Sequence, residues 1–162
     1  MNKILVSGLI NIETTLKVDR FPLEYFPVTY PFHGIQSTIS GVGFNLAKTL
    51  TILGNHVNLL SLIGMDFYEA IIRTECFEIK INDQHLLAVL PQTAQSVILY
   101  EKGGRRQIHT DLKDIQEQQY PLERFEQAAL DCDLCILCNI NFNRHLLRSE
   151  EHTSELQSPN TI

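Results

Sequence analysis

Apolar, strand-like runs alternate along this chain with segments whose apolar residues recur at helical spacing. The strand-like runs cover 3–10, 56–64 and 133–140. The helical segments cover 43–53, 65–77 and 121–132. Asp66 is placed to cap the second helical segment, and Pro121 stands in the first turn of the third. This order is typical of a parallel sheet joined by crossover helices, so the sequence predicts an α/β fold.

Two pieces do not fit the strand–helix alternation. Residues 12–36 include the proline-containing segment 22–32, which we expect to be an edge strand or an irregular flap because proline cannot donate to a central ladder. Residues 94–111 alternate apolar and polar positions on both sides of "KGGR", which indicates a β-hairpin. We expect these two pieces to pair into a small secondary sheet.

Composition narrows the class of protein. The 162 residues carry a net charge of −6 and contain no Lys/Arg-rich run, which argues against a general nucleic-acid surface. No apolar run approaches the roughly 20 residues that a membrane span needs, so no membrane partner is expected. Four cysteines do not make a disulfide scaffold, and a reducing cytoplasm is the expected location.

The stretch "STISGVGFNLAKTLTILG" (37–54) admits several interpretations. A dinucleotide-binding fingerprint would require glycine at Leu46, and a Walker-type phosphate loop would require a lysine in register. A tight turn that caps a core helix is one remaining alternative. The other is a ligand site, in which Gly41 and Gly43 bring bare backbone and free helix N–H groups to a ligand. Asn45 would add a donor and an acceptor suited to sugar hydroxyls.

The spacing G-x-G-x-N-x-A, then six residues to Gly54 and nine to Gly64, resembles the first signature of the ribokinase (PfkB) family of carbohydrate kinases. Ser40 departs from it, since the family usually has glycine or alanine there. The opening "SGLINIE" is similar to the family's first strand followed by G-x-x-N-x-D. The resemblance covers 3–147, about the N-terminal half of such a kinase. It implies a partial ribokinase-like three-layer α/β/α domain over 1–147 with a small β-sheet lid and no C-terminal half.

The resemblance also implies which residues bind substrate: Asn11, Glu13, Gly41, Gly43, Asn45 and Asn141. Asn141 follows the strand-like run where family members often have an acidic residue. Glu13 replaces the usual aspartate and Val42 the lysine of ribokinases proper, which argues against ribose itself. The alternative for Asn11 and Glu13 is a polar strand end that faces solvent.

The family's catalytic chemistry is not expected in this chain. Its aspartate base and glycine anion hole belong to a "GAGD"-like stretch of the C-terminal half, and no such stretch occurs in 1–162. The resemblance thus implies an inactive fragment of an ATP-dependent kinase that phosphorylates a sugar or nucleoside hydroxyl. ATP and Mg²⁺ would serve the intact parent, and no metal site is expected here. The alternative function is a non-catalytic sugar-binding module, or a module that dimerises through the lid.

Three further features remain. Cys132, Cys135 and Cys138 resemble an iron–sulfur run without its fourth cysteine, and on a strand the middle thiol would face away from the other two, so structural thiols are expected. Arg105 and Arg106, at the predicted hairpin turn, either contact an anionic substrate or belong to a solvated turn. Residues 148–159, within the terminal stretch 148–162, resemble a translated sequencing adapter, and we expect this tail to be artefactual.

Overall fold

A parallel four-stranded sheet forms the centre of the computed structural model, which describes residues 1–147. Its strands, in the order β5–β4–β1–β8, are β5 (Asn82–Leu90), β4 (His56–Gly64), β1 (Lys3–Ser7) and β8 (Leu134–Leu137). Val6 on β1 lies opposite Leu59 on β4 and Ile136 on β8. The expected artefactual tail, 148–162, lies outside the described residues.

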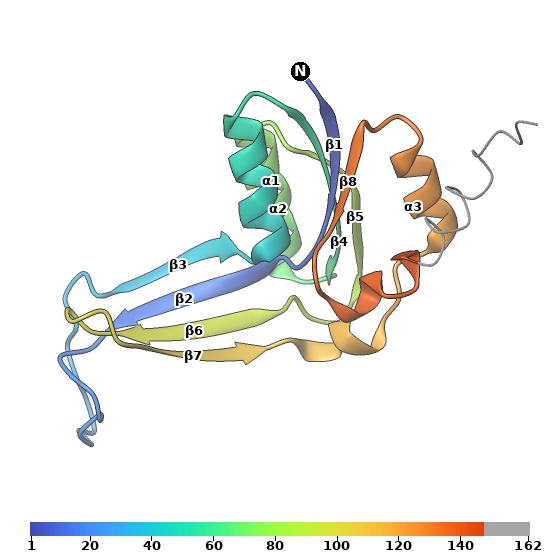
Figure 1. The fold of residues 1–162 in the computed structure, drawn as a ribbon. Coiled ribbons are helices and arrows are strands. Elements are labelled where there is room, and N and C mark those ends of the chain that lie inside the picture. The colour runs from blue at the N-terminus through green and yellow to red at the C-terminus, as the bar shows by residue number, and fades with distance from the viewer. Residues whose placement is uncertain (148–162) are drawn as a thin grey trace, which may run out of the picture.

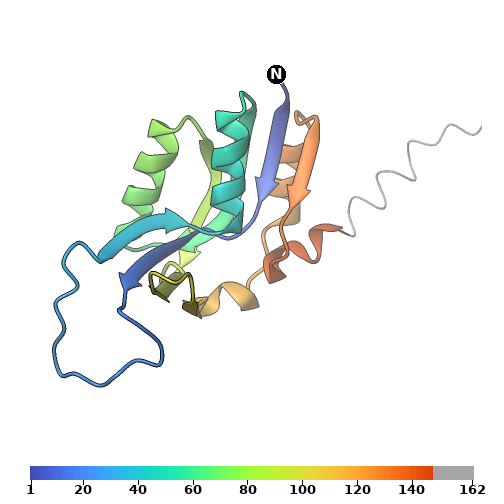
Figure 2. The same cartoon turned by 60° about the vertical axis from the view of Figure 1, so that its left-hand side comes forward.

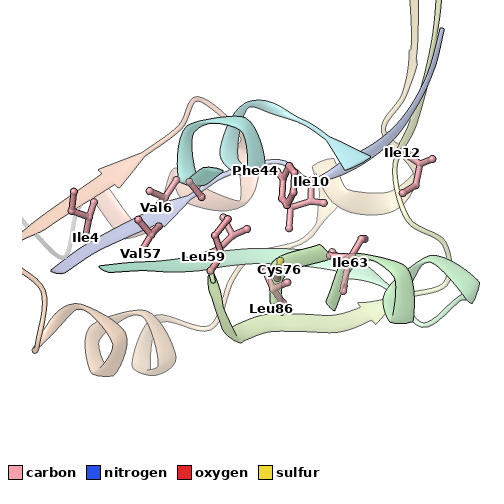
Figure 3. Close-up of a cluster of buried hydrophobic side chains, with 13 residues drawn as sticks. Ile4, Val6, Ile10, Ile12, Phe44, Val57, Leu59, Ile63, Cys76 and Leu86 are labelled. Atoms are coloured by element: carbon pink, nitrogen blue, oxygen red, sulfur yellow. The ribbon is translucent and has the colours of Figure 1, made fainter. Parts of the chain in front are cut away.

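Helices cover both faces of this sheet (Figure 1). α1 (Val42–Ile52) and α2 (Phe67–Glu78) lie on one face, and α3 (Leu122–Ala129) lies on the other. A buried cluster including Val6, Leu59 and Phe44 fills the α1/α2 side (Figure 3). A second cluster, centred on Leu60, Tyr120 and Phe125, fills the α3 side. All-parallel sheets need cover on both faces, and the predicted three-layer arrangement is confirmed.

A second sheet projects from one end of the first (Figures 1 and 2). Its order is β3 (Ile35–Ser40), β2 (Asn11–Lys17), β6 (Gln95–Tyr100) and β7 (Arg106–Asp111). The β2–β3 pair interrupts the connection from β1 to α1, and the β6–β7 hairpin interrupts the connection from β5 to α3. Parallel pairing of β2 with β6 joins the two insertions, so the expected small sheet is confirmed. We call this sheet the lid.

Two short 3₁₀ helices, η1 (Lys113–Glu117) and η2 (Asn141–Asn143), complete the described elements. The strand β5 has no counterpart in the sequence analysis, because its first residues are polar and only Leu86 and Leu90 are fully buried. It lies at the edge of the sheet, where a strand needs little apolar surface. None of the helices between residues 1 and 147 has the length and apolar character needed to cross a bilayer.

The chain between β2 and β3 is irregular, as the prolines predicted, and forms the far end of the lid (Figure 2). Arg105 holds it to the β6–β7 turn. Its guanidinium pairs with Glu101 at 2.6 Å, donates to the Phe21 carbonyl at 3.3 Å and lies 6.0 Å from the Phe21 ring centroid. Arg105 therefore has a structural role, in place of the anionic-substrate contact considered from the sequence.

The three clustered cysteines divide differently from the prediction. Cys132 and Cys135 pack against the α3 side of the sheet, whereas Cys138 packs against the α1/α2 side. The predicted placement of Cys132 on the same face as Cys138 is wrong, because β8 begins only at Leu134 and strand alternation does not reach Cys132. Two of the thiols pack into one core and the third into the other, so the three do not converge on one point. This arrangement agrees with the prediction that they are structural thiols.

Two buried weak acids predict how stability depends on pH. Burial raises the pKa of Cys76 to about 12, and burial also raises the pKa of Tyr120 to about 12. In the unfolded chain these groups ionise near 9.0 and 10.0. Above pH 9 the unfolded chain therefore releases protons that the folded chain keeps, so the free energy of unfolding falls as pH rises.

We expect urea unfolding to give a clearly lower free energy at about pH 10.5 than at pH 8. Each group can contribute up to about 1.4 kcal/mol per pH unit between its two pKa values. A Cys76→Ala variant removes the Cys76 contribution and should show a shallower fall. Equal stability of the parent chain at both pH values would contradict the burial of these groups.

Candidate functional site

The root of the lid brings polar residues from four elements together. Asn11, the first residue of β2, is 4% exposed, and its Nδ2 donates to Ser96 Oγ on β6 at 2.8 Å. Asn11 comes only four positions after the end of β1, and Gly8–Ile10 carry the chain from the central sheet into the lid. The lid root is thus fixed to the carboxyl end of β1.

Ser40 joins the other two predicted polar residues. Its hydroxyl donates to Glu13 Oε2 at 3.1 Å and accepts from Asn45 Nδ2 at 3.2 Å. Glu13 lies on β2 and Asn45 in the first turn of α1. Ser40, which departs from the family pattern in the sequence, is therefore the link between them.

These five residues, Asn11, Glu13, Ser40, Asn45 and Ser96, form what we call the lid-root cluster. Strand register places its β residues on one face of the lid: Asn11 lies opposite Ser40, and Glu13 lies beside Ser96. Glu13 carries the only formal charge of the five, and the others offer neutral donors and acceptors. The predicted residues Asn11, Glu13 and Asn45 are brought together, whereas the sequence analysis missed the roles of Ser40 and Ser96. Alternation along the predicted hairpin was the available signal for Ser96.

One acceptor of the cluster lacks a donor. Asn11 Oδ1 is buried and has no hydrogen-bond partner among the described residues. Buried polar atoms are almost always paired in folded proteins. This oxygen is therefore suited to receive a hydroxyl from a bound molecule.

The two glycines have the packing role that the sequence offered as one alternative, a tight turn at the start of a core helix. A Cβ on Gly41 would lie 2.4 Å from the Leu9 carbonyl oxygen, and one on Gly43 would lie 2.5 Å from the Gly8 carbonyl carbon. The Leu9 carbonyl accepts from the N–H of Gly43 at 3.0 Å and of Phe44 at 3.3 Å. The expectation of free N–H groups is thus wrong at Gly43 and Phe44, because the chain that leaves β1 closes the N-terminus of α1.

Asn141 forms its side-chain hydrogen bond outside the lid-root cluster. After β8 the chain turns into η2, where the Asn141 amide donates to the Gln116 carbonyl. Asn141 lines a hollow of about 440 Å³ together with Gln116, Arg144 and His145. The neighbouring Asn143 is instead 2% exposed: its Oδ1 accepts from Ser7 Oγ at 2.5 Å and its Nδ2 donates to the carbonyls of Ser7 and Cys138. Asn143 therefore ties β8 to β1.

The start of β6 is fastened by Asp66. Its carboxylate caps α2 as predicted, accepting from Tyr68 N–H at 3.0 Å. It also accepts from the backbone N–H of Thr93 at 2.7 Å and from the Thr93 hydroxyl at 2.9 Å. Because Ala94 accepts from the N–H of Ile12, this contact sets the position at which β6 meets β2.

A second hollow, of about 270 Å³, is lined by Gln95, Val97, His109 and Asp111, with Ser96 and Thr110. The side chains at positions 95, 97, 109 and 111 alternate with Ser96 and Thr110 along β6 and β7. They therefore point to the face of the lid opposite the lid-root cluster. Within residues 1–147 no group of three or more His, Cys, Asp or Glu side chains is arranged to hold a metal ion. The lid-root cluster is thus the candidate site, with partners for a neutral polar ligand.

Comparison with known structures shows the same fold. A microbiome-derived acarbose kinase superimposes with a TM-score of 0.82 at 18% identity, over 94% of this chain and 50% of that one. The nucleoside kinase of Methanocaldococcus jannaschii, an archaeal member of the ribokinase family, gives 0.69 at 20% identity, over 88% and 47%. The ADP complex of ribokinase from Cryptococcus neoformans var. grubii serotype A gives 0.55 at 22% identity, over 68% and 35%.

This chain spans half or less of the length of those three proteins. No match was found among curated proteins. The model of the pfkB family carbohydrate kinases matches residues 1–147, nearly the whole chain. The chain therefore belongs to the pfkB family of carbohydrate kinases.

Proposed function

We propose that this chain supplies the sugar-binding side of an ATP-dependent kinase that phosphorylates a hydroxyl of a sugar or nucleoside. The lid-root cluster binds the ligand through Asn11, Glu13 and Asn45, and Gly41 and Gly43 shape the wall beside them. The 162-residue chain by itself binds substrate without turning it over. Asn141 remains a prediction from the family pattern, since its amide is engaged with Gln116.

The unpaired Asn11 Oδ1 carries this proposal. A solvent-facing strand end, the alternative interpretation of Asn11 and Glu13, does not agree with a side chain that is 4% exposed. The Glu13 carboxylate accepts from Ser40 through Oε2, and its other oxygen, Oε1, takes no part in that hydrogen bond. A carboxylate oxygen accepts strongly from hydroxyl groups. Two acceptors on neighbouring same-face positions of β2 suit the adjacent hydroxyls of a sugar ring.

ATP and Mg²⁺ are the cofactors proposed for the whole kinase, by analogy with the ADP complex of the Cryptococcus ribokinase. The residues described here do not fit either group. Two first-turn N–H groups of α1 that could bind phosphate are taken by the Leu9 carbonyl, and no three or more His, Cys, Asp or Glu side chains gather to hold a metal ion in the described part of the chain. We therefore assign no step of phosphoryl transfer to these residues.

The test is calorimetric titration of the 162-residue chain with D-ribose, D-fructose, uridine and adenosine. We expect at least one ligand to bind, and Asn11→Ala and Asn45→Ala to weaken it about fivefold or more, the cost of one hydrogen bond to a neutral group. Asn45 is exposed, so its removal should leave folding intact even where Asn11→Ala does not.

Asn2→Ala is the matched control, because the Asn2 side chain is exposed and remote from the lid. Equal weakening by the control, or binding that survives both cluster variants unchanged, would remove the cluster from the site. Incubation of the same sample with ATP, Mg²⁺ and ligand should release no ADP.

The alternative is a non-catalytic module that binds sugar or dimerises through the lid. An exposed apolar set on the irregular lid loop favours self-association: Leu23, Tyr25, Phe26, Val28, Tyr30 and Phe32. We propose a homodimer through this end of the lid, in the cytoplasm, with a small molecule as ligand and neither nucleic acid nor membrane as partner. Sedimentation of a monomer at every concentration would contradict the dimer and leave the binding site untouched.

A further inference from the structure

The chain enters strand β6 of the lid through residues 91–94, which pass close to the end of β4. A Cβ on Gly64, the last residue of β4, would lie 2.3 Å from the Thr93 nitrogen and 2.6 Å from the Gln92 carbonyl carbon. The Gly64 N–H donates to Thr93 Oγ1 at 3.0 Å, and Thr93 is 0% exposed. This passage into the lid is therefore seated directly on the central sheet.

Asp66 holds the same passage from the N-terminus of α2. Its Oδ2 accepts from the Thr93 N–H at 2.7 Å, and its Oδ1 accepts from the Thr93 hydroxyl at 2.9 Å. Oδ1 also accepts from the Tyr68 N–H, the bond that caps α2. Hydrogen bonds to an ionised carboxylate are stronger than those to a neutral acceptor. One carboxylate thus fastens a helix of the central domain to the strand that carries Ser96.

The Asn11 amide lies between two such attachments. On the β2 side, the Leu9 carbonyl is bonded to the first turn of α1. On the β6 side, Asp66 holds Thr93, which comes three positions before Ser96. Ser96 is 5% exposed, and its Oγ accepts from Asn11 Nδ2 at 2.8 Å. This bond fixes the orientation of the amide, so Oδ1 rather than Nδ2 is left for a ligand.

An amide presents a donor and an acceptor of nearly the same shape, and a half-turn of the group exchanges them. Without Ser96 in place, Asn11 would be free to turn either group toward the ligand. We propose that Asp66 is a positioning residue of the ligand site: through Thr93 it holds Ser96 where Ser96 orients the Asn11 amide. This inference rests on the proposed function of the lid-root cluster, to which Asp66 itself does not belong.

Two variants release the passage. Asp66→Asn keeps one oxygen, enough to cap α2, and replaces the other with an N–H donor that cannot accept from Thr93. Thr93→Val removes the hydroxyl and keeps the size of the side chain. The probe is the tightest-binding ligand among D-ribose, D-fructose, uridine and adenosine. We expect both variants to weaken its binding about fivefold or more in calorimetric titration.

Thr93→Ser is the conservative variant, because it keeps the hydroxyl that Asp66 and Gly64 bind. It should bind the same probe within about twofold of the parent chain. A loss of affinity that follows the hydroxyl, rather than the size of the side chain, identifies the bond to Asp66 as the cause.

A second readout needs no ligand. The side-chain NH₂ resonances of Asn11 in an isotope-labelled chain report its bond to Ser96. We expect Asp66→Asn and Thr93→Val to shift these resonances and to speed their exchange with water, because the buried bond is loosened. Thr93→Ser should leave them close to their positions in the parent chain.

Asp83→Asn is the matched control. The Asp83 carboxylate also accepts a charge-assisted bond, from Arg73 at 2.8 Å, but it lies at the start of β5. Because β5 runs parallel to β4 and β1, that start is at the end of the sheet opposite the lid (Figure 1). Asp83→Asn should lower the free energy of unfolding without changing ligand affinity or the Asn11 resonances.

Three results would overturn the role of Asp66 and leave the proposed function standing. They are unchanged Asn11 resonances in Asp66→Asn and Thr93→Val, an equal shift in Asp83→Asn, and parent-like ligand affinity in both releasing variants. Failure of every probe to bind a parent chain with an intact unfolding transition overturns the proposed function and this inference together.

Discussion

Replacing Gly43 with alanine is expected to unfold this chain or to lower its free energy of unfolding by at least about 3 kcal/mol. The new methyl carbon would lie 2.5 Å from the Gly8 carbonyl carbon and 2.7 Å from the Gly8 Cα and oxygen. All three are backbone atoms, so no side-chain rotation can relieve the overlap. The N-terminus of α1 would have to move away from Leu9, whose carbonyl caps the first turn.

Gly103→Ala is the control, because among residues 1–147 its new Cβ would meet no backbone atom within 4 Å apart from its chain neighbours, and the nearest side-chain atom is a Glu101 oxygen at 3.0 Å. We expect a change of about 0.5 kcal/mol or less there. Urea unfolding of both variants measures the difference. A Gly43→Ala chain as stable as the Gly103→Ala chain would show that α1 is not seated on the β1–β2 connection.

The stability of the Gly43→Ala chain also distinguishes between two explanations of the Gly41/Gly43 pair. The sequence indicated either a turn that caps a core helix or bare backbone for a ligand, and spacing alone does not separate them. The contacts show that Gly43 is required by helix packing. The proposed ligand role then falls mainly to side chains, and Asn45 is held near Glu13 only because α1 begins where the glycines allow.

The sequence predicted the fold where local pattern and tertiary environment agree. β4, buried for most of its length, reads as an apolar run, and the "KGGR" turn marks the β6–β7 hairpin. β5 was missed because an edge strand can be polar at its start, and periodicity finds a strand only where a face is buried. Cys132 was assigned to the wrong face because strand ends are the least certain part of a pattern.

The site was predictable only in part, for a similar reason. Asn11, Glu13 and Asn45 were found through a resemblance that fixes their spacing. Ser96 contributes through the pairing of β2 with β6, a contact between residues 85 positions apart. Alternation along the hairpin indicates the face of Ser96 but not the strand with which β6 pairs. Asn141 and Asn143 differ by two positions, and only the turn into η2 determines which one is buried against β1.

Asn143→Ala is expected to have the second large effect on stability. The amide side chain accepts from the Ser7 hydroxyl and donates to the Ser7 carbonyl across the contact between β1 and β8, and it donates to the Cys138 carbonyl on its own side of that contact. Ser7 is 0% exposed, so its hydroxyl would be left unpaired, whereas the Ser7 and Cys138 carbonyls keep the N–H groups of Cys138 and Ile140. A buried group left unpaired costs roughly 1–3 kcal/mol and each lost hydrogen bond about 0.5–1.5 kcal/mol, so we expect a total loss of about 3 kcal/mol.

Asn141→Ala is the matched control, since it removes the same side chain two positions away, where the hydrogen bond to Gln116 is exposed to water. Its expected effect is about 0.5 kcal/mol or less by urea unfolding. A Ser7→Ala variant tests the assignment further, because in the Asn143→Ala background it removes the stranded hydroxyl and should cost less than it does alone. Additive losses from the two changes would mean that the Ser7 hydroxyl and Asn143 do not act together.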